Sequence, residues 1–143
     1  MIQVNWDEKD KSIIRLEISG EWTWEEYHDG THKIAELMNT VDYRVDVIME
    51  MGDAGPLPMS AASLHLHSGL ERTPENHGVT VIVEADKLTR MVIESLDRVL
   101  PAARDHFFFA GSVSAARRVI LVQRGASFSS GLDSETRPII PRS

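Results

Sequence analysis

The sequence predicts an α/β protein built on a single mixed β-sheet, and three observations lead to this fold class. Segments with strand-like alternation or β-branched runs are followed, one after another, by segments with helical periodicity. The first two strand-like segments have no helix between them, as in a hairpin. The length of 143 residues, of which 42% are hydrophobic, suits one domain. We therefore expect the element order ββαβαβαβα.

The first two strands are predicted over residues 2–6 and 12–18. In both segments every second residue is apolar, which is the period of a half-buried strand. The charged run DEKDK separates the two segments and is short enough for a direct turn. We expect an antiparallel hairpin at the start of the chain.

The first helix is predicted to begin directly after Thr23. Apolar residues recur at helical spacing over 24–41. Thr23 and Glu26 have the spacing of a capping box, in which two side chains satisfy the free amides of a helix start. Trp22 and Tyr27 stand at the two positions of a hydrophobic staple, so the helix start is signalled twice.

A strand and a second helix are predicted on either side of a loop rich in Gly and Pro. The strand covers 44–51, where the nearly continuous apolar run is typical of a buried strand. The helix is predicted over 60–72 with Ser60 as its N-cap. Gly69 lowers the helical propensity of this segment.

The next strand and helix follow the same pattern. The β-branched run over 79–83 is typical of a central parallel strand. Asp86 is the predicted N-cap of a third helix, whose apolar stripe runs along 86–103. Pro101 is expected to end or bend this helix because proline lacks the amide hydrogen that a helix interior needs.

The last elements are a short aromatic strand over 107–110 and a helix along 113–123 with Ser112 as its N-cap. From Gly125 onward the chain is rich in Ser, Gly and Pro, which predicts a mobile tail. We therefore expect a single domain over 1–124 and a C-terminal tail over 125–143.

The connections determine the expected topology. Each strand from the second onward is followed by a helix, and right-handed crossovers then make those four strands parallel, with the first strand as an antiparallel edge. In such sheets ligands bind outside the carboxyl ends of the strands, where the helices begin. Any functional site is expected at that edge.

This element order resembles the antisigma-factor-antagonist fold, or STAS domain, and especially its SpoIIAA-like relatives, which resemble the lipid-binding CRAL-TRIO fold. The resemblance covers about residues 1–124 and implies a non-enzymatic regulatory or binding module. In the antagonists, a kinase of the partner system phosphorylates a serine in an Asp-Ser-Ser-Gly type motif at the start of the corresponding helix. Here that stretch reads PMSAA over 58–62, so Ser60 matches the phosphorylated hydroxyl, whereas Met59 replaces the Asp and the Gly is missing.

Composition and motifs exclude several function classes. With 22 acidic against 15 basic residues the net charge is −7, which disfavours nucleic-acid binding. No apolar run approaches the ~20 residues of a membrane span, and the first residues lack the pattern of a signal peptide, so we expect a cytoplasmic protein. Cysteine is absent, and no nucleophile elbow or Gly-rich phosphate loop occurs. The sequence predicts no enzyme and no cofactor.

Several basic residues lie in or next to the first turns of the third and fourth helices, where the helix dipole disfavours cations by roughly 0.3–1 kcal/mol each. They are Lys87, Arg90, Arg117 and Arg118. Either an anionic ligand or acidic partner compensates them, or Glu25 and Glu26 pair with them at the surface, or water screens them. The predicted ligand- or partner-binding residues are Ser60, Asp86, Lys87, Ser112 and Arg117.

Histidines offer a further candidate site. His28 and His32 are four residues apart on the first helix, the spacing at which two imidazoles can meet one metal ion. No HExxH motif accompanies them, so the sequence favours exposed helical histidines and no metal. His65 and His67 are two residues apart and point in different directions on a helix, so they cannot chelate together.

Three further interpretations stay open. The methionines at the exit of the third strand, Met49, Met51 and Met59, suit an adaptable contact surface or an apolar-ligand or lipid carrier. An uncharacterised enzyme that uses a histidine at the same edge is the alternative of a different class. The aromatic strand over 107–110, if it lies at a sheet edge, can pair across a two-fold axis and form a homodimer.

Overall fold

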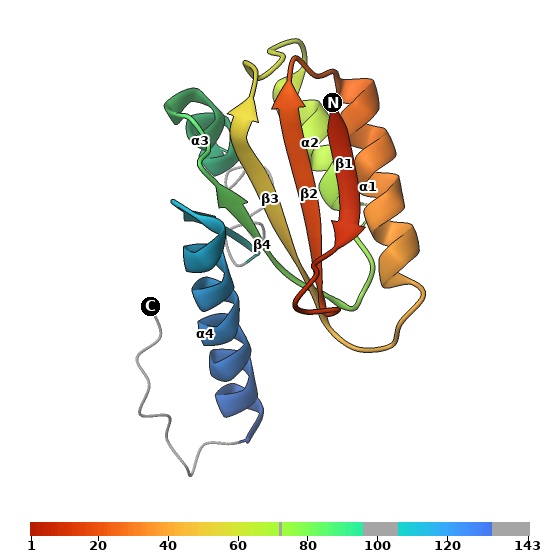
Figure 1. The fold of residues 1–143 in the computed structure, drawn as a ribbon, viewed down its shortest axis with the longest axis vertical. Helices are drawn as coiled ribbons and strands as arrows, with labels where there is room; N and C mark the ends of the chain where they lie inside the picture. Colours follow the sequence, from red (N-terminus) through yellow and green to blue (C-terminus); the bar gives the residue numbers. More distant parts are fainter. Residues whose placement is uncertain (72, 96–105, 133–143) are drawn as a thin grey trace.

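Five strands form one mixed sheet in the order β1-β2-β3-β4-β5 (Figure 1). The computed structural model describes residues 1–71, 73–95 and 106–132. β1 is antiparallel to β2, and the other neighbouring strands are parallel, as the sequence predicts. The strands are β1 (Ile2–Trp6), β2 (Ile13–Gly20), β3 (Val45–Ala54), β4 (His77–Val83) and β5 (Phe107–Ala110).

Each parallel strand is followed by a helix. Because these strands run the same way, their carboxyl ends share one edge of the sheet, here called the C-terminal edge. The four helices in the described ranges begin there. This confirms the predicted gathering of helix starts. The helices are α1 (Trp24–Met38), α2 (Ala62–Glu71), α3 (Lys87–Glu94) and α4 (Val113–Leu132).

Two apolar cores lie on opposite faces of the sheet. Side chains alternate between the two faces along each strand, so β2 sends Ile14, Leu16 and Ile18 into a core with α1, α2 and α3. The opposite face carries Val79, Val81 and Val83 of β4 under α4. Figure 1 shows α4 over the β4 side of this face, and no other helix that the structure describes lies over its β1 and β2 side.

Local signals placed the start of α1 correctly. Thr23 is the N-cap: its hydroxyl accepts a hydrogen bond from the Glu26 amide at 3.1 Å, and the Glu26 carboxylate accepts one from the Thr23 amide at 3.1 Å. The staple is also formed, since the ring centroids of Trp22 and Tyr27 are 6.4 Å apart. The capping box and staple therefore fix where the chain leaves the hairpin and turns into the helix.

The start of α2 differs from the prediction. Ser60 is not its N-cap, because Ala61 stands between Ser60 and the first helical residue and has φ +54°. A left-handed alanine carries no signal in the sequence. Gly69, which weakened the helix prediction, is buried against α1: a Cβ at this position would lie 2.5 Å from the Tyr27 Oη. The glycine therefore allows α1 and α2 to approach closely.

The C-terminal helix is longer than the sequence predicts. Its backbone stays helical past Gly125 and through Leu132, so the expected tail does not begin at Gly125. A glycine inside a helix costs only about 1 kcal/mol, which is too little to end it. The N-caps of the last two helices are as predicted, whereas the expected continuation of the third helix beyond Ser95, Pro101 included, lies outside the described residues.

No helix in the described part of the chain is both long enough and apolar enough to span a bilayer.

Candidate functional site

The predicted site residues Ser60, Asp86, Lys87 and Ser112 all lie exposed at the C-terminal edge. Two of these residues cap the helices that follow them. Asp86 accepts a hydrogen bond from the Thr89 amide at 2.7 Å, and the hydrogen bonds from Thr89 lower the pKa of Asp86. The Ser112 hydroxyl accepts one from the Ala115 amide at 3.0 Å. Their positions match the prediction, but their side chains act as helix caps.

Arg117 does not join the other predicted residues. Its guanidinium donates a hydrogen bond to the Asp7 carboxylate at 2.6 Å, and Asp7 is only 1% exposed. The Asp7 amide donates to the carbonyl of Ile13, where β2 begins, so this pair lies toward the opposite edge of the sheet. The partner that compensates Arg117 is therefore Asp7, and not the expected Glu25 or Glu26.

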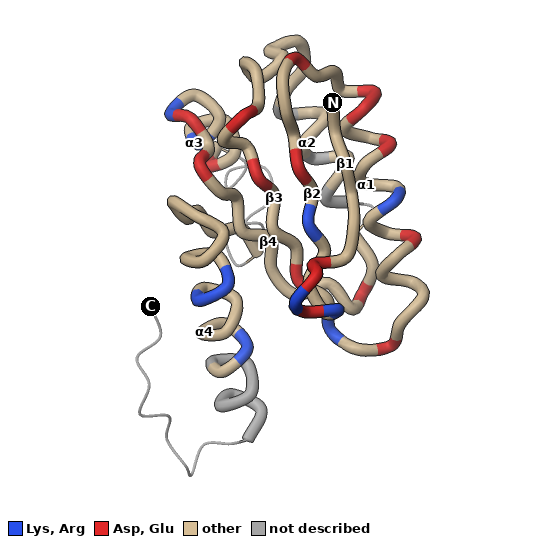
Figure 2. Tube along the Cα trace, in the orientation of Figure 1, with Lys and Arg blue, Asp and Glu red and all other residues tan. Residues whose placement is uncertain are grey.

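The C-terminal edge is acidic. The loops and strand ends there carry the exposed carboxylates Glu21, Asp53, Glu84 and Asp86 (Figure 2). Two basic residues, Lys87 and Arg90, lie at the same edge. The Arg90 guanidinium lies 4.5 Å from the centroid of the Phe109 ring. An excess of like charge repels an anionic ligand and attracts a basic partner. The acidic charge of this edge therefore disfavours the binding of an anionic small molecule, one of the alternatives that the sequence left open.

Large apolar side chains are exposed beside these carboxylates. They lie on the loop before α2, on the first turn of α2 and on the first two turns of α3, and the two helices contact each other. We call this set the edge patch. It consists of Met59 at 55% exposure, Leu64 at 65%, Leu88 at 43% and Met91 at 58%. Apolar side chains rimmed by charge are typical of a protein interaction surface.

Two tryptophans hold the loop that leads to the edge patch. The indole of Trp22 donates a hydrogen bond to the Gly55 carbonyl at 3.3 Å, and that of Trp24 donates to the Pro58 carbonyl at 3.1 Å. The two rings meet edge to face with centroids 5.1 Å apart. The tryptophans are therefore core and scaffold residues, and their hydrogen bonds position the loop at Pro58, directly before Met59.

The histidines of the first two helices form a pair that the sequence did not indicate. His28 Nε2 lies 2.8 Å from His65 Nδ1, and His65 stacks on Trp24 with ring centroids 4.9 Å apart. His28 is half-buried, so its predicted full exposure is wrong, whereas His32 is exposed. Within the described residues no group of three or more potential ligands can hold a metal ion. The pair joins α1 to α2.

A small apolar cavity lies between α1, α2 and the sheet. Its volume is about 60 Å³, and its lining includes Tyr27, Met38, Val47 and Phe107. A water molecule occupies about 30 Å³ in the liquid, and pockets for drug-sized ligands measure roughly 300–1,000 Å³. The cavity formed by the described residues is therefore far too small for a lipid chain.

His77 borders this cavity at the start of β4. Burial, together with the nearby His106, lowers the pKa of His77 to about 4. Its Nε2 lies 2.9 Å from the Thr80 hydroxyl. This histidine is at the end of β4 opposite the C-terminal edge, so it is no candidate for a catalytic histidine next to Ser60.

The low pKa of His77 predicts a loss of stability in mild acid. The imidazole has a pKa near 6.5 in the unfolded chain, so below that pH the unfolded chain binds a proton that the folded chain does not bind. The stability of the fold therefore falls as the pH drops toward 4. The free energy of unfolding should fall by about 2 kcal/mol between pH 7 and 4.5 from this residue. Urea unfolding at both pH values should show this loss reduced in His77→Gln and retained in His32→Gln. An equal loss in both variants would contradict the assignment.

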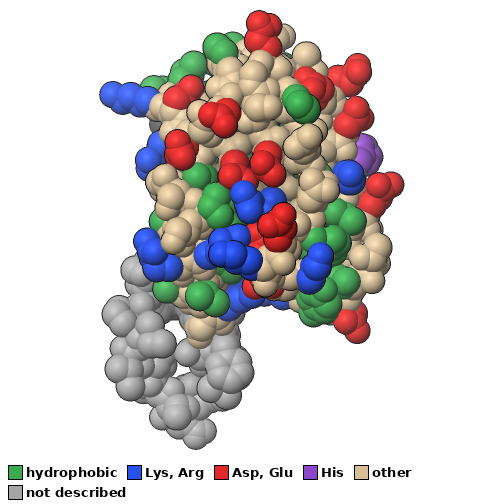
Figure 3. All heavy atoms as spheres, viewed as in Figure 1, with side chains coloured by type: hydrophobic (Ala, Val, Ile, Leu, Met, Phe, Trp, Pro, Cys, Tyr) green, Lys and Arg blue, Asp and Glu red, His purple; other side chains and the backbone are tan. Residues whose placement is uncertain are grey.

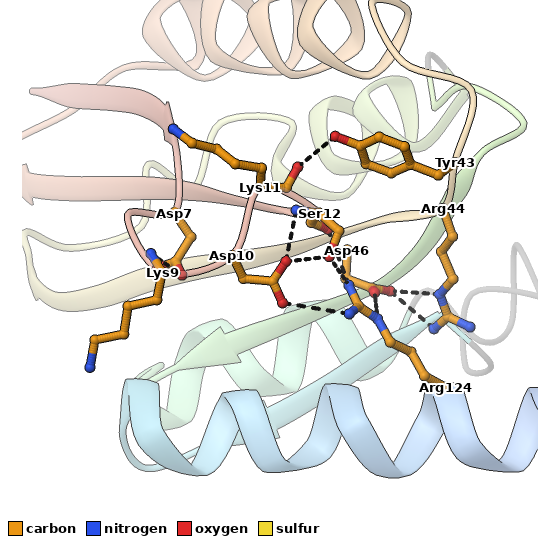
Figure 4. Close-up of polar contacts among 9 residues, drawn as sticks. All are labelled: Asp7, Lys9, Asp10, Lys11, Ser12, Tyr43, Arg44, Asp46 and Arg124. Atoms are coloured by element: carbon orange, nitrogen blue, oxygen red, sulfur yellow. Dashed lines mark hydrogen bonds and ion pairs between the residues drawn. The ribbon is translucent and has the colours of Figure 1, made fainter.

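Buried carboxylates gather at the other edge of the sheet (Figure 4). Asp46, with no exposed surface, accepts hydrogen bonds from the Val79 amide at 2.8 Å and from Arg44 at 3.1 Å. Arg124 of α4 donates to the same carboxylate at 2.7 Å and to the Ser12 hydroxyl at 2.8 Å. Because Arg124 belongs to α4 and Asp46 to β3, this network fastens α4 to the sheet.

A second ion-pair group lies along the same face, where Figure 3 shows basic and acidic side chains side by side. Arg15 donates hydrogen bonds to Glu50 at 2.9 Å and to Asp7 at 3.2 Å. Burial alone would raise the pKa of Asp7, but the hydrogen bonds from Arg117 and Arg15 bring it below its usual value. These charges are matched within the chain, so the face needs no charged ligand.

Comparisons with known proteins bear on the fold. No family model matches the chain, and no curated protein matches it. The order and pairing of the strands and the packing of the helices define a SpoIIAA-like α/β fold. A solved structure with that fold, an uncharacterized protein of the DUF3478 family from Shewanella loihica PV-4, matches this chain with a TM-score of 0.55. The match covers 82% of this chain and 90% of that chain at 15% identity, which confirms the predicted fold.

Proposed function

We propose that this protein is a non-enzymatic binding module that docks a protein partner through the edge patch. The observation that carries the proposal is the exposure of Leu64 and Met91, which are 65% and 58% accessible on two helices that start at the same edge. A SpoIIAA-like fold is consistent with such a role. The proposed partner surface is apolar at its centre and basic at its rim, because the exposed carboxylates Glu84 and Asp86 directly precede α3, which carries Leu88 and Met91.

Ser60 is the proposed point of control. It is exposed and directly follows Met59, so its hydroxyl is open to a kinase while its neighbour belongs to the edge patch. A phosphate there would place nearly two negative charges within an apolar contact and oppose its desolvation. Ser60→Asp is therefore expected to weaken capture of the partner, whereas equal capture by Ser60→Asp and wild type would reject Ser60 as the switch.

Leu64→Glu and Met91→Glu are expected to lower the affinity for the partner by about 10–100-fold each. Burying such a side chain contributes about 1.5–3 kcal/mol, and the new carboxylate must also be desolvated. The partner is first identified by co-purification from the protein's own host, and its dissociation constant is then measured by calorimetry. Both side chains are exposed, so the fold should be unaffected.

The matched control is Leu121→Glu. Leu121 is 64% exposed on α4, so it has the same exposure as Leu64 but lies away from the edge patch. Its substitution should leave the affinity within about twofold of wild type. Equal losses from Leu121→Glu and Leu64→Glu would mean that the partner docks elsewhere or that the effect comes from net charge.

The carrier interpretation receives no support from a cavity of about 60 Å³. Native mass spectrometry of protein from its own host distinguishes a lipid carrier from a protein-binding module. Under the proposal the measured mass equals that of the chain alone or with its protein partner. A retained lipid would instead favour the carrier.

A further inference from the structure

β5 forms the edge of the sheet opposite β1, the position at which the sequence allows pairing across a two-fold axis. The carbonyls of His106 and Ala110 accept hydrogen bonds at 2.7 and 3.0 Å from amides in and directly after β4. Backbone groups alternate in direction along a strand, so the amides and carbonyls of Phe107 and Phe109 point away from the sheet. In the described part of the chain no strand pairs with this side of β5.

The side chains of this edge strand are aromatic and uncharged. Three consecutive phenylalanines make up most of β5, and its residues are half-buried on both faces of the sheet. Phe107 and Phe109 pack against the core under α1, α2 and α3, whereas Phe108 packs against the core under α4. The strand contains no charge and no proline, and its register with β4 is free of bulges. It therefore lacks the features that usually keep an exposed edge from pairing.

The helices next to β5 leave room for a second sheet. α4 contacts β4 more than any other strand, so it lies inside the edge (Figure 1). If two copies paired through β5, three strand spacings would separate their β4 strands, and the two α4 helices would lie about 14 Å apart. Packed helices need only about 8–10 Å between their axes. On the other face, Arg90 of α3 lies over Phe109 at the carboxyl end of β5, so antiparallel pairing places the two α3 helices toward opposite ends.

The sequence of β5 fits a second copy of itself. In an antiparallel pair with Phe108 on the two-fold axis, Phe107 lies opposite Phe109 of the second copy, and the outward backbone groups of both residues bond across the axis. Each of these cross-strand pairs is aromatic, which is a favourable pairing. His106 falls opposite Ala110, so no like charges meet. Because the chain has a net charge of −7, two copies repel each other over most of their surface, and an uncharged edge is the best place for contact.

We propose that two copies of this chain pair through β5 in this register and form a two-fold dimer with one continuous sheet. The pairing is closed, because each copy covers the free edge of the other and leaves no edge at β5 for further growth. The two C-terminal edges point in opposite directions, so both edge patches stay accessible. The dimer therefore does not depend on the function proposed for the edge patch.

The first test is the mass of the full chain in solution. Sedimentation velocity and native mass spectrometry at micromolar concentration should both give the mass of two chains without a lipid. Phe108→Glu and Phe108→Lys each place like charges on the axis and should give monomers. An equimolar mixture of the two variants should restore the dimer, because opposite charges then face each other. A monomeric wild type, or a mixture of folded variants that stays monomeric, would overturn the proposal.

Single cysteines test the register independently, because the chain has no cysteine of its own. At Phe108 the two copies form a non-hydrogen-bonded pair with Cα atoms about 4.5 Å apart, within the range of a disulfide. Phe108→Cys should therefore give a covalent dimer under mild oxidation. Phe107→Cys is the matched control, since its two copies are displaced by about 6.6 Å along the strands in addition to the strand spacing. Equal crosslinking of the two variants, or none from Phe108→Cys, would overturn the proposal.

Discussion

Replacing Asp46 by alanine is expected to lower the free energy of unfolding by about 3–5 kcal/mol, because the substitution removes the buried carboxylate of an ion-pair network. The Asp46 carboxylate has no exposed surface and accepts hydrogen bonds from the Val79 amide, Arg44 and Arg124. The substitution would leave the buried Val79 amide without its acceptor and would remove the carboxylate that Arg44 and Arg124 share. Urea unfolding followed by tryptophan fluorescence measures the change.

The neighbouring carboxylate of Asp10 provides the control. It lies 3.6 Å from the same Arg124 but its side chain is 39% exposed, and exposed pairs contribute about 0–1 kcal/mol. Asp10→Ala should therefore cost much less than Asp46→Ala. If the two variants lowered the free energy of unfolding equally, the contribution of Asp46 would come from its charge alone and not from its burial.

Trp24→Ala is expected to cost about 3–5 kcal/mol, the usual range for truncating a large buried aromatic residue. Trp24 is 8% exposed, packs edge to face on Tyr27 with centroids 5.3 Å apart, and stacks on His65. It also donates to the Pro58 carbonyl, so its loss should free the loop before α2. Thermal and urea unfolding report the stability, and hydrogen exchange reports the loop.

Trp24→Phe separates these two roles. Phenylalanine keeps most of the ring contacts but lacks the indole N–H, so the loss should be near 1–2 kcal/mol and should fall on the loop before α2. A cost below about 1 kcal/mol for Trp24→Ala would contradict the packing described here. So would unchanged hydrogen exchange around Met59 in Trp24→Ala.

Most of the fold was predictable because its signals are local. The capping box at Thr23 and Glu26, the alternation in the hairpin and the buried β-branched run of β4 each act within a few residues. Where the local signal was weak, the predicted end of an element differs from the structure. The Gly and Ser content after Gly125 suggested a tail, yet α4 continues through Leu132.

The side-chain contacts were not predictable because they join distant parts of the chain. His28 and His65 are 37 residues apart, and Arg117 and Asp7 are 110 apart. No periodicity relates such positions, and one sequence gives no covariation to find them. The edge itself was predictable from topology, whereas its acidic character depends on loop residues such as Glu84 whose placement only the fold reveals.

The most direct test of the central claim is photocrosslinking at defined positions in the living host. A benzophenone amino acid is placed at Leu64 or Met91 of the edge patch, or at Leu121 on α4, which is as exposed as Leu64. One crosslinked protein is expected from both Leu64 and Met91, and it should be absent from Leu121. A partner that crosslinks through Leu121 alone, or none from either edge position, would contradict it.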